Sequence, residues 1–96
     1  MQKNYEAVLI LKPDLAEEER KKLFSQIAEP IAKNNGTIAK QEVWIEKRKL
    51  IFPIKKCQEG LYYLLRFSGG PELTAQLNRS YKLNENILRT LIIKLD

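Results

Sequence analysis

Four segments of the chain have the residue pattern of β-strands. Tyr5–Leu11 is a short apolar run rich in Tyr, Val and Ile, which is typical of a buried strand. Thr37–Ile54 is a long extended segment that we expect to be bent or bulged, and Pro53 near its end favours a sheet edge, where a missing N–H is tolerated. Leu61–Phe67 and Ile87–Leu95 are the two remaining predicted strands.

Between the first two predicted strands, apolar residues recur at steps of three and four, which indicates one face of a helix. These residues are Leu15, Leu23, Phe24, Ile27, Ala28, Ile31 and Ala32. Asp14 is a suitable N-cap for this helix, since Glu17 three residues later completes a capping-box spacing. Pro30 removes one helical N–H, so we expect either a kink there or an end near Glu29 followed by a looser turn. The Asn-Asn-Gly sequence that follows stops the helix, with Gly36 suited to the left-handed position after it.

A second, shorter helix is predicted between the last two strands. Its apolar stripe consists of residues four apart, namely Leu73, Leu77 and Tyr81. Ser68–Pro71 breaks the preceding strand and leads into the helix, where a proline is tolerated in the first turn. Asn84–Asn86 ends the helix, and Cys57–Gly60 is the predicted turn of a hairpin between the second and third strands.

The predicted order of elements is strand, helix, strand, strand, helix, strand, in a single domain of residues 1–96. Two such strand–helix–strand units form a four-stranded antiparallel sheet with both helices on one face, which is the ferredoxin-like α+β plan. Right-handed crossovers place the first and third strands in the middle. Both faces of these strands are apolar, so Val8, Ile10 and Tyr62 or their alternates face outward. We therefore expect either a partner on the open face or coverage by loops or by the bent second strand.

The composition limits the chemistry that the chain can perform. It has 17 Lys or Arg and 12 Asp or Glu, and the resulting net charge of +5 favours an anionic partner. Histidine is absent and Cys57 is the single cysteine, so the commonest general base, the Cys–His pair and the usual metal-ligand sets are missing. No apolar run has the length of a membrane span, about 18 residues. We expect no catalytic residue, metal, cofactor, small-molecule substrate or membrane partner.

The stretch Lys47–Lys56 combines positive charge with an apolar centre. Its basic residues are Lys47, Arg48, Lys49, Lys55 and Lys56, and the stretch contains no acid. These cations either contact nucleic-acid phosphate or are solvated at a strand edge and turn, where charge discourages aggregation. Leu50, Phe52 and Ile54 share one strand face at a period of two, so we expect them in the core or at a protein interface.

Aromatic residues on the predicted strands are a further set of candidates. Tyr5, Trp44, Tyr62 and Tyr63 either stack on nucleobases or, as is commoner, are half-buried within the sheet. We assign Trp44 and Tyr62 to a surface for a protein partner, together with the three apolar residues of the basic stretch.

Several short motifs occur in a fixed order along the chain. They are Tyr5-Glu6, Leu11–Leu15, Asn35-Gly36, Lys47–Ile54, Gly60–Tyr63 and Tyr81–Arg89, which together span essentially the whole sequence. Their order and spacing resemble the ribosomal protein S6 family of the small subunit, whose hallmark is a basic cluster followed by Leu-Ala-Tyr-Pro-Ile. Here Ile51 and Phe52 replace the small residue and the tyrosine. Glu46 stands where the family usually has glycine, and Trp44 lies one place before its usual aromatic.

The resemblance implies a protein without catalytic activity that binds the central domain of small-subunit ribosomal RNA together with ribosomal protein S18. It also implies RNA contacts from a basic residue before the first tyrosine and from the end of the second helix and the turn after it. These residues are Lys3, Arg79, Lys82, Asn84 and Arg89, and the resemblance further favours phosphate contacts by Lys47, Arg48 and Lys49. The implied location is the ribosome of a bacterial cytoplasm, with a plastid stroma as the alternative.

Two other classes of function are compatible with the same fold. One is a general single-stranded RNA-binding module of the RNA-recognition-motif kind, but Leu61–Phe67 lacks the glycines and the spacing that this motif has on its third strand. The other is a small ferredoxin-like enzyme or ligand sensor. The lack of His, of a Cys pair and of a Gly-rich phosphate loop disfavours it. Ribosomal RNA binding is therefore the leading hypothesis.

Overall fold

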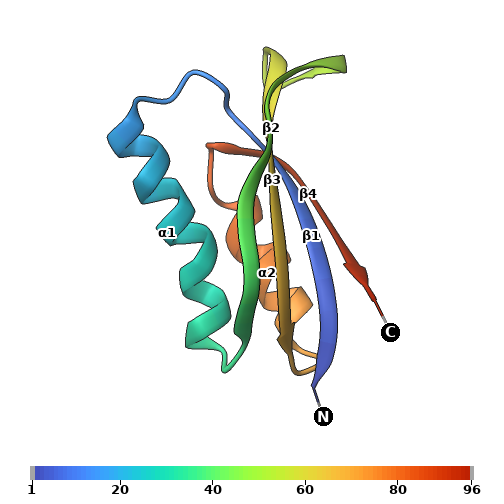
Figure 1. The fold of residues 1–96 in the computed structure, drawn as a ribbon. Helices are drawn as coiled ribbons and strands as arrows, with labels where there is room; N and C mark the ends of the chain where they lie inside the picture. Colours follow the sequence, from blue (N-terminus) through green and yellow to red (C-terminus); the bar gives the residue numbers. More distant parts are fainter. Residues whose placement is uncertain (1, 96) are drawn as a thin grey trace.

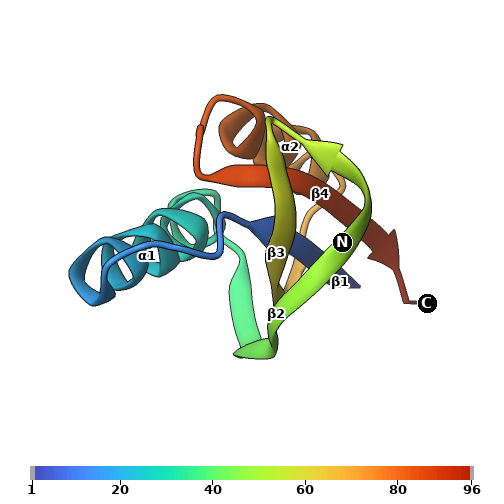
Figure 2. The same ribbon diagram turned by 90° about the horizontal axis from the view of Figure 1, so that it is seen from above.

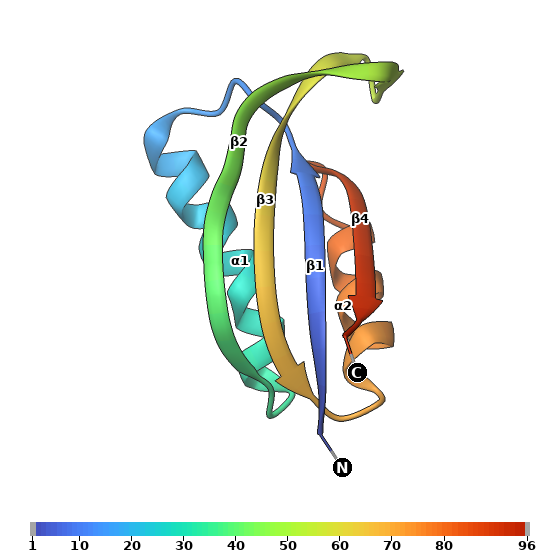
Figure 3. The same cartoon turned by 45° about the vertical axis from the view of Figure 1, so that its right-hand side comes forward.

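Six elements follow one another in the order that the sequence predicts. The computed structural model describes residues 2–95 and contains β1 (Lys3–Leu11), α1 (Glu17–Lys33), β2 (Thr37–Ile54), β3 (Cys57–Gly69), α2 (Leu73–Lys82) and β4 (Ile87–Lys94). All strand pairings are antiparallel and the sheet order is β2-β3-β1-β4. Both helices pack on one face of the sheet (Figure 1), and Figure 3 looks onto the opposite, open face. The predicted ferredoxin-like plan is confirmed.

The core lies between the helices and the inner face of the sheet. Alternate strand residues are buried there, namely Tyr5, Ala7, Leu9 and Leu11 of β1 and Leu61, Tyr63, Leu65 and Phe67 of β3. The predicted helix stripes meet them, with Leu23, Ile27 and Ile31 from α1 and Leu73, Leu77 and Tyr81 from α2. Each of these large side chains contributes roughly 1.5–3 kcal/mol by leaving water. This burial fixes which strand face remains open.

The two helices begin slightly later than predicted. The N-cap residue of α1 is Ala16, whose N–H donates to the carboxylate of Glu19 at 3.4 Å as one half of a capping box. The prediction that Asp14 caps this helix is therefore wrong. Glu72 is the N-cap residue of α2, so Pro71 precedes that helix instead of lying in its first turn. Within residues 2–95, neither helix is long and apolar enough to cross a bilayer.

The end of α1 depends on both Asn35 and Gly36. The helix continues through Pro30 and does not end before it. The residue in the left-handed conformation is Asn35, with φ of 63°, so the assignment of that role to Gly36 is wrong. Gly36 instead donates its N–H to the Ile31 carbonyl at 2.7 Å. A Cβ at Gly36 would lie 2.8 Å from Ile31 and 2.9 Å from Leu73, so close packing against α2 requires the glycine.

The β2–β3 hairpin turns at Lys55 and Lys56, not at the predicted Cys57–Gly60. Both lysines have positive φ, 48° and 67°, and Ile54 pairs directly with Cys57 across them. This is the pattern of a two-residue type I′ turn, whose twist matches that of the flanking strands. The segment predicted as the turn therefore belongs to β3.

The distal part of this hairpin bends over the sheet. The β2–β3 pairing shifts register at several points, and β2 is an edge strand with Pro53 near its end, as predicted. Figures 2 and 3 show the distal hairpin curving towards the β4 side. A Cβ added at Gly60 would lie 2.5 Å from Ile10 and 3.5 Å from Leu50, so both side chains lie close to this glycine. The bent strand thus covers the upper end of the open face and leaves the rest uncovered.

Candidate nucleic-acid and protein interfaces

A basic pocket of about 450 Å³ lies where the hairpin tip meets α2 and β4. It is lined by Lys55, Asn78, Tyr81, Lys82, Ile87, Leu88, Arg89 and Thr90. Three of these side chains, Lys55, Lys82 and Arg89, are predicted RNA-binding residues, and they come from the β2–β3 turn, α2 and β4. Within residues 2–95, no acidic side chain lines this pocket. The pocket therefore concentrates positive charge, as a site for phosphate requires.

Local structure positions each cation of this basic pocket. The Lys55 ammonium donates to the Ile87 carbonyl at 3.3 Å, which holds the hairpin tip against the start of β4. An ammonium carries three N–H donors, so further donors remain for a ligand. Lys82 lies in the last turn of α2, where the negative end of the helix dipole favours a cation. Arg89 directly follows a break in the β1–β4 register at Leu88, and such bulges redirect side chains.

The basic triplet of β2 makes contacts within the protein. The Lys47 ammonium lies 3.5 Å from the carboxylate of Asp14 and 3.8 Å from that of Glu59. The Arg48 guanidinium lies over the ring of Tyr62, 6.0 Å from its centroid. Lys49 is exposed and pairs in register with Glu59. The triplet is thus divided between two sides of the hairpin and does not line the basic pocket.

The remaining predicted RNA-binding residues are dispersed. Lys56 lines a separate pocket with Lys12 and Cys57, and Arg79 is exposed on α2. Lys3 begins β1 and pairs with Gly69 at the end of β3, remote from the hairpin turn. Figure 1 shows the N-terminus and the hairpin at opposite ends of the sheet. The structure therefore brings together only part of the predicted set.

Asn84 makes contacts that organise the α2–β4 corner. Its side-chain N–H donates to the Gln26 side chain of α1 at 3.0 Å, and its side-chain oxygen accepts from the N–H of Asn86 at 3.0 Å. Both ends of the amide are therefore used within the protein. In this conformation Asn84 fixes the turn between the residues that carry Lys82 and Arg89.

The uncovered part of the sheet carries an apolar surface, which we name the open-face patch. It consists of Val8, Trp44, Tyr62, Leu64, Leu91 and Ile93. Val8 pairs with Leu64 on one side and with Leu91 on the other, and Trp44 meets Tyr62 edge-on at 6.5 Å. Trp44 and Leu91 are 57% and 60% exposed. Exposed apolar residues grouped in this way are typical of interaction sites.

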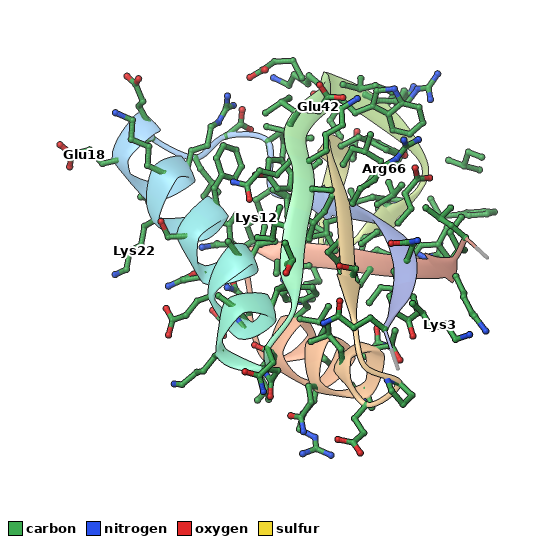
Figure 4. The ribbon with its side chains drawn as sticks, turned by 60° about the horizontal axis from the view of Figure 1, so that its bottom comes forward. Lys3, Lys12, Glu18, Lys22, Glu42 and Arg66 are labelled. Carbon is green, nitrogen blue, oxygen red and sulfur yellow. The ribbon has the colours of Figure 1, made fainter. Side chains whose placement is uncertain are left out.

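Ion pairs flank the open-face patch and give it a polar border. The Arg66 guanidinium lies 2.8 Å from the Glu6 carboxylate on the neighbouring strand, and Lys40 lies 3.1 Å from Glu42. Figure 4 shows Glu42 and Arg66 on neighbouring strands. The patch is therefore an apolar centre with a polar rim, which is the usual anatomy of a protein interface.

The predicted protein-partner residues differ in burial. Leu50 is 8% exposed and Ile54 is half-buried, whereas Phe52 is 77% exposed. The strand pairing is irregular between Lys49 and Ile54, so a period of two does not give these side chains one environment. Sequence reasoning also missed Leu91 and Ile93, although their alternation with Ile92, which packs against the core, indicates an outward face.

Two of the four candidate stacking aromatics are inaccessible. Tyr5 and Tyr63 are 6% and 2% exposed, and Tyr63 stacks on Phe24 of α1 with 4.4 Å between ring centroids. Tyr62 is the aromatic residue that β1 and β3 place on the open face. This arrangement does not provide the aromatic platform of an RNA-recognition motif.

Comparisons of the sequence and of the structure find the same family. The family model described as ribosomal protein S6 matches residues 4–94. The small ribosomal subunit protein bS6 of Caldanaerobacter subterraneus subsp. tengcongensis is 40% identical over 94 residues, and that of Thermoanaerobacter pseudethanolicus is 42% identical over 94 residues; each match covers 98% of both chains. The crystal structure of 30S ribosomal protein S6 from Thermotoga maritima has a TM-score of 0.87 at 28% identity, covering 99% of this chain and 89% of that one. The chain described here belongs to the ribosomal protein S6 family.

Proposed function

We propose that this protein is a structural constituent of the small ribosomal subunit that performs no chemistry. It binds the central domain of the small-subunit ribosomal RNA together with ribosomal protein S18. Membership of the ribosomal protein S6 family supports the ribosomal role. The relatives described above are bacterial, which favours ribosomes of a bacterial cytoplasm over those of a plastid.

The basic pocket is the observation that carries the RNA-binding proposal. Lys55, Lys82 and Arg89 are distant in sequence, yet they line one hollow. A guanidinium can donate two parallel hydrogen bonds to a phosphate, while the lysines act as point charges beside it. Recognition of this kind reads the shape and the backbone of folded RNA and not a base sequence.

The open-face patch supports binding of the protein partner on a neighbouring surface. Arg89 pairs in register with Ile10, which in turn pairs with Tyr62 of the patch. The basic pocket and the patch are therefore adjoining surfaces. RNA and S18 bound to these two surfaces would lie next to each other, which supports the proposal that they bind together.

Substitutions in the basic pocket test the RNA proposal. We expect Lys55→Ala, Lys82→Ala and Arg89→Ala each to weaken binding to a central-domain RNA fragment with S18 by about tenfold, or roughly 1.4 kcal/mol. The triple variant should also flatten the dependence of affinity on salt, by about 0.7–0.9 in slope for each lost phosphate contact. Filter binding or calorimetry across salt concentrations measures both effects.

Lys22→Ala is the matched control, because this lysine points outward from α1 (Figure 4). It removes one positive charge, as each of the single variants does, and should change affinity less than twofold. A triple variant that binds as tightly as Lys22→Ala would contradict the assignment. Equally tight binding of the wild type to short unstructured RNA without S18 would favour a general RNA-binding module instead.

A further inference from the structure

Phe52 is a large apolar residue that lies exposed, outside the core of the protein. Its side chain is 77% exposed, although an apolar ring of this size gains roughly 1.5–3 kcal/mol from burial. Leu50, two residues earlier, is 8% exposed and reaches Gly60 of the facing strand. The hairpin is thus anchored at Leu50, and the ring of Phe52 lies beyond that anchor, free for a partner.

The backbone around Phe52 is constrained on both sides. Pro53 fixes its own φ, and Ile54 pairs with Cys57 across the two-residue turn. The Lys55 ammonium ties the tip to the Ile87 carbonyl at 3.3 Å. Because the segment is already ordered, it loses little conformational entropy when a partner binds the ring.

The charge around Phe52 selects the kind of partner. Lys49, Lys55 and Lys56 are exposed on the same short segment, and no acid interrupts residues 47–56. Asp14 and Glu59 lie near Lys47, Glu59 also pairs in register with Lys49, and both acids line a pocket with Lys56. The five cations of residues 47–56 outnumber these two acids, so the balance at the tip stays positive. An apolar partner surface would gain nothing from these cations, whereas RNA offers both phosphates for the lysines and flat bases for the ring.

We propose that Phe52, which the sequence pattern assigns to a protein interface, instead stacks on an unpaired nucleobase of the ribosomal RNA while the flanking lysines hold adjacent phosphates. This inference rests on the proposed function and adds a stacking contact outside the basic pocket. Stacking of an aromatic ring on a base depends on the π-face of both partners and tolerates any base. The neighbouring Ile51 is 92% exposed but has no ring, so it serves as an internal control.

Affinity measurements with the central-domain RNA fragment and S18 test this proposal. We expect Phe52→Ala to weaken binding about tenfold without changing the salt slope, since no cation is removed. Phe52→Tyr keeps a ring and should bind within twofold of the wild type, as should Ile51→Ala. Equal affinity of Phe52→Ala and the wild type would overturn the stacking contact while leaving the proposed function intact. Failure of the wild type to bind RNA would overturn both.

Fluorescence of a Phe52→Trp variant identifies which partner meets the ring. Trp44 is the single natural tryptophan, so the wild type supplies the background signal. S18 is added first and the RNA fragment second. Quenching of the added tryptophan on RNA addition is the expected result. A change on addition of S18 alone, with none on RNA addition, would show that residue 52 contacts protein and would overturn the proposal.

Discussion

At the scale of single residues, Tyr81 links the two helices within the core. Its hydroxyl donates to the Ile27 carbonyl at 2.6 Å. Burial, and secondarily the nearby Tyr63, raise the pKa of Tyr81 above the ordinary tyrosine value of about 10. Burial also raises the pKa of Tyr63. The folded state therefore keeps these protons at a pH where the unfolded chain loses them.

This difference predicts a loss of stability at alkaline pH. The contribution of Tyr81 is fully present below the unfolded pKa of about 10 and is lost as pH rises through the higher folded pKa. We expect Tyr81→Phe to cost about 1 kcal/mol at neutral pH through the lost hydrogen bond, and to reduce the alkaline loss. Urea unfolding at a series of pH values measures both effects. An alkaline loss of the same size in Tyr81→Phe would count against the role of this hydroxyl.

Asn35 and Gly36 show how far residue-level prediction reaches. The Asn-Asn-Gly sequence correctly indicates where α1 stops. It does not indicate which residue takes the left-handed conformation, because that depends on contacts with another element. A Cβ at Gly36 would meet Leu73 of α2, which lies 37 positions away in the sequence. A rule that reads only neighbouring residues does not include this contact.

At the scale of elements, the β2–β3 hairpin differs most from its prediction. Cys57–Gly60 contains the glycine that turn rules favour, whereas Lys55 and Lys56 carry no turn signal. The observed turn is nevertheless at the lysines, and Gly60 serves close packing against Ile10. A left-handed conformation costs roughly 1–2 kcal/mol per non-glycine residue. Strained residues that a fold tolerates are often retained for function.

The double variant Lys55→Asn with Lys56→Gly tests whether the lysines of the turn lower stability but favour RNA binding. Asn-Gly is the preferred type I′ sequence, so we expect the free energy of unfolding to rise by about 1 kcal/mol or more. Affinity for the RNA fragment should fall, because the basic pocket loses the Lys55 cation. Denaturant unfolding and RNA binding give the two values. Lys55→Ala separates the effect on affinity from the effect on stability, since it should lower affinity without stabilising the fold. An Asn-Gly variant that is no more stable than the wild type would argue against backbone strain in the turn.

At the scale of the whole molecule, the sequence predicts the fold but does not predict that Lys55, Lys82 and Arg89 line one pocket. Apolar periodicity determines the strands, the helices and the open face, because these follow from repeating local patterns. The basic pocket forms only because the hairpin bends across to α2 and β4, which brings together Lys55 and Arg89 from opposite ends of the sheet order. The same bend covers part of the open face and leaves the open-face patch.

Adjoining but separate surfaces for RNA and for S18 are the central proposal, and crosslinking within assembled small subunits tests it most directly. The chain should sediment with the subunits, and mass spectrometry should locate its crosslinks to each partner. We predict RNA crosslinks at Lys55, Lys82 and Phe52, and S18 crosslinks at Trp44 and Leu91. RNA crosslinks concentrated on the open-face patch, or absence of the chain from the subunits, would contradict the proposal.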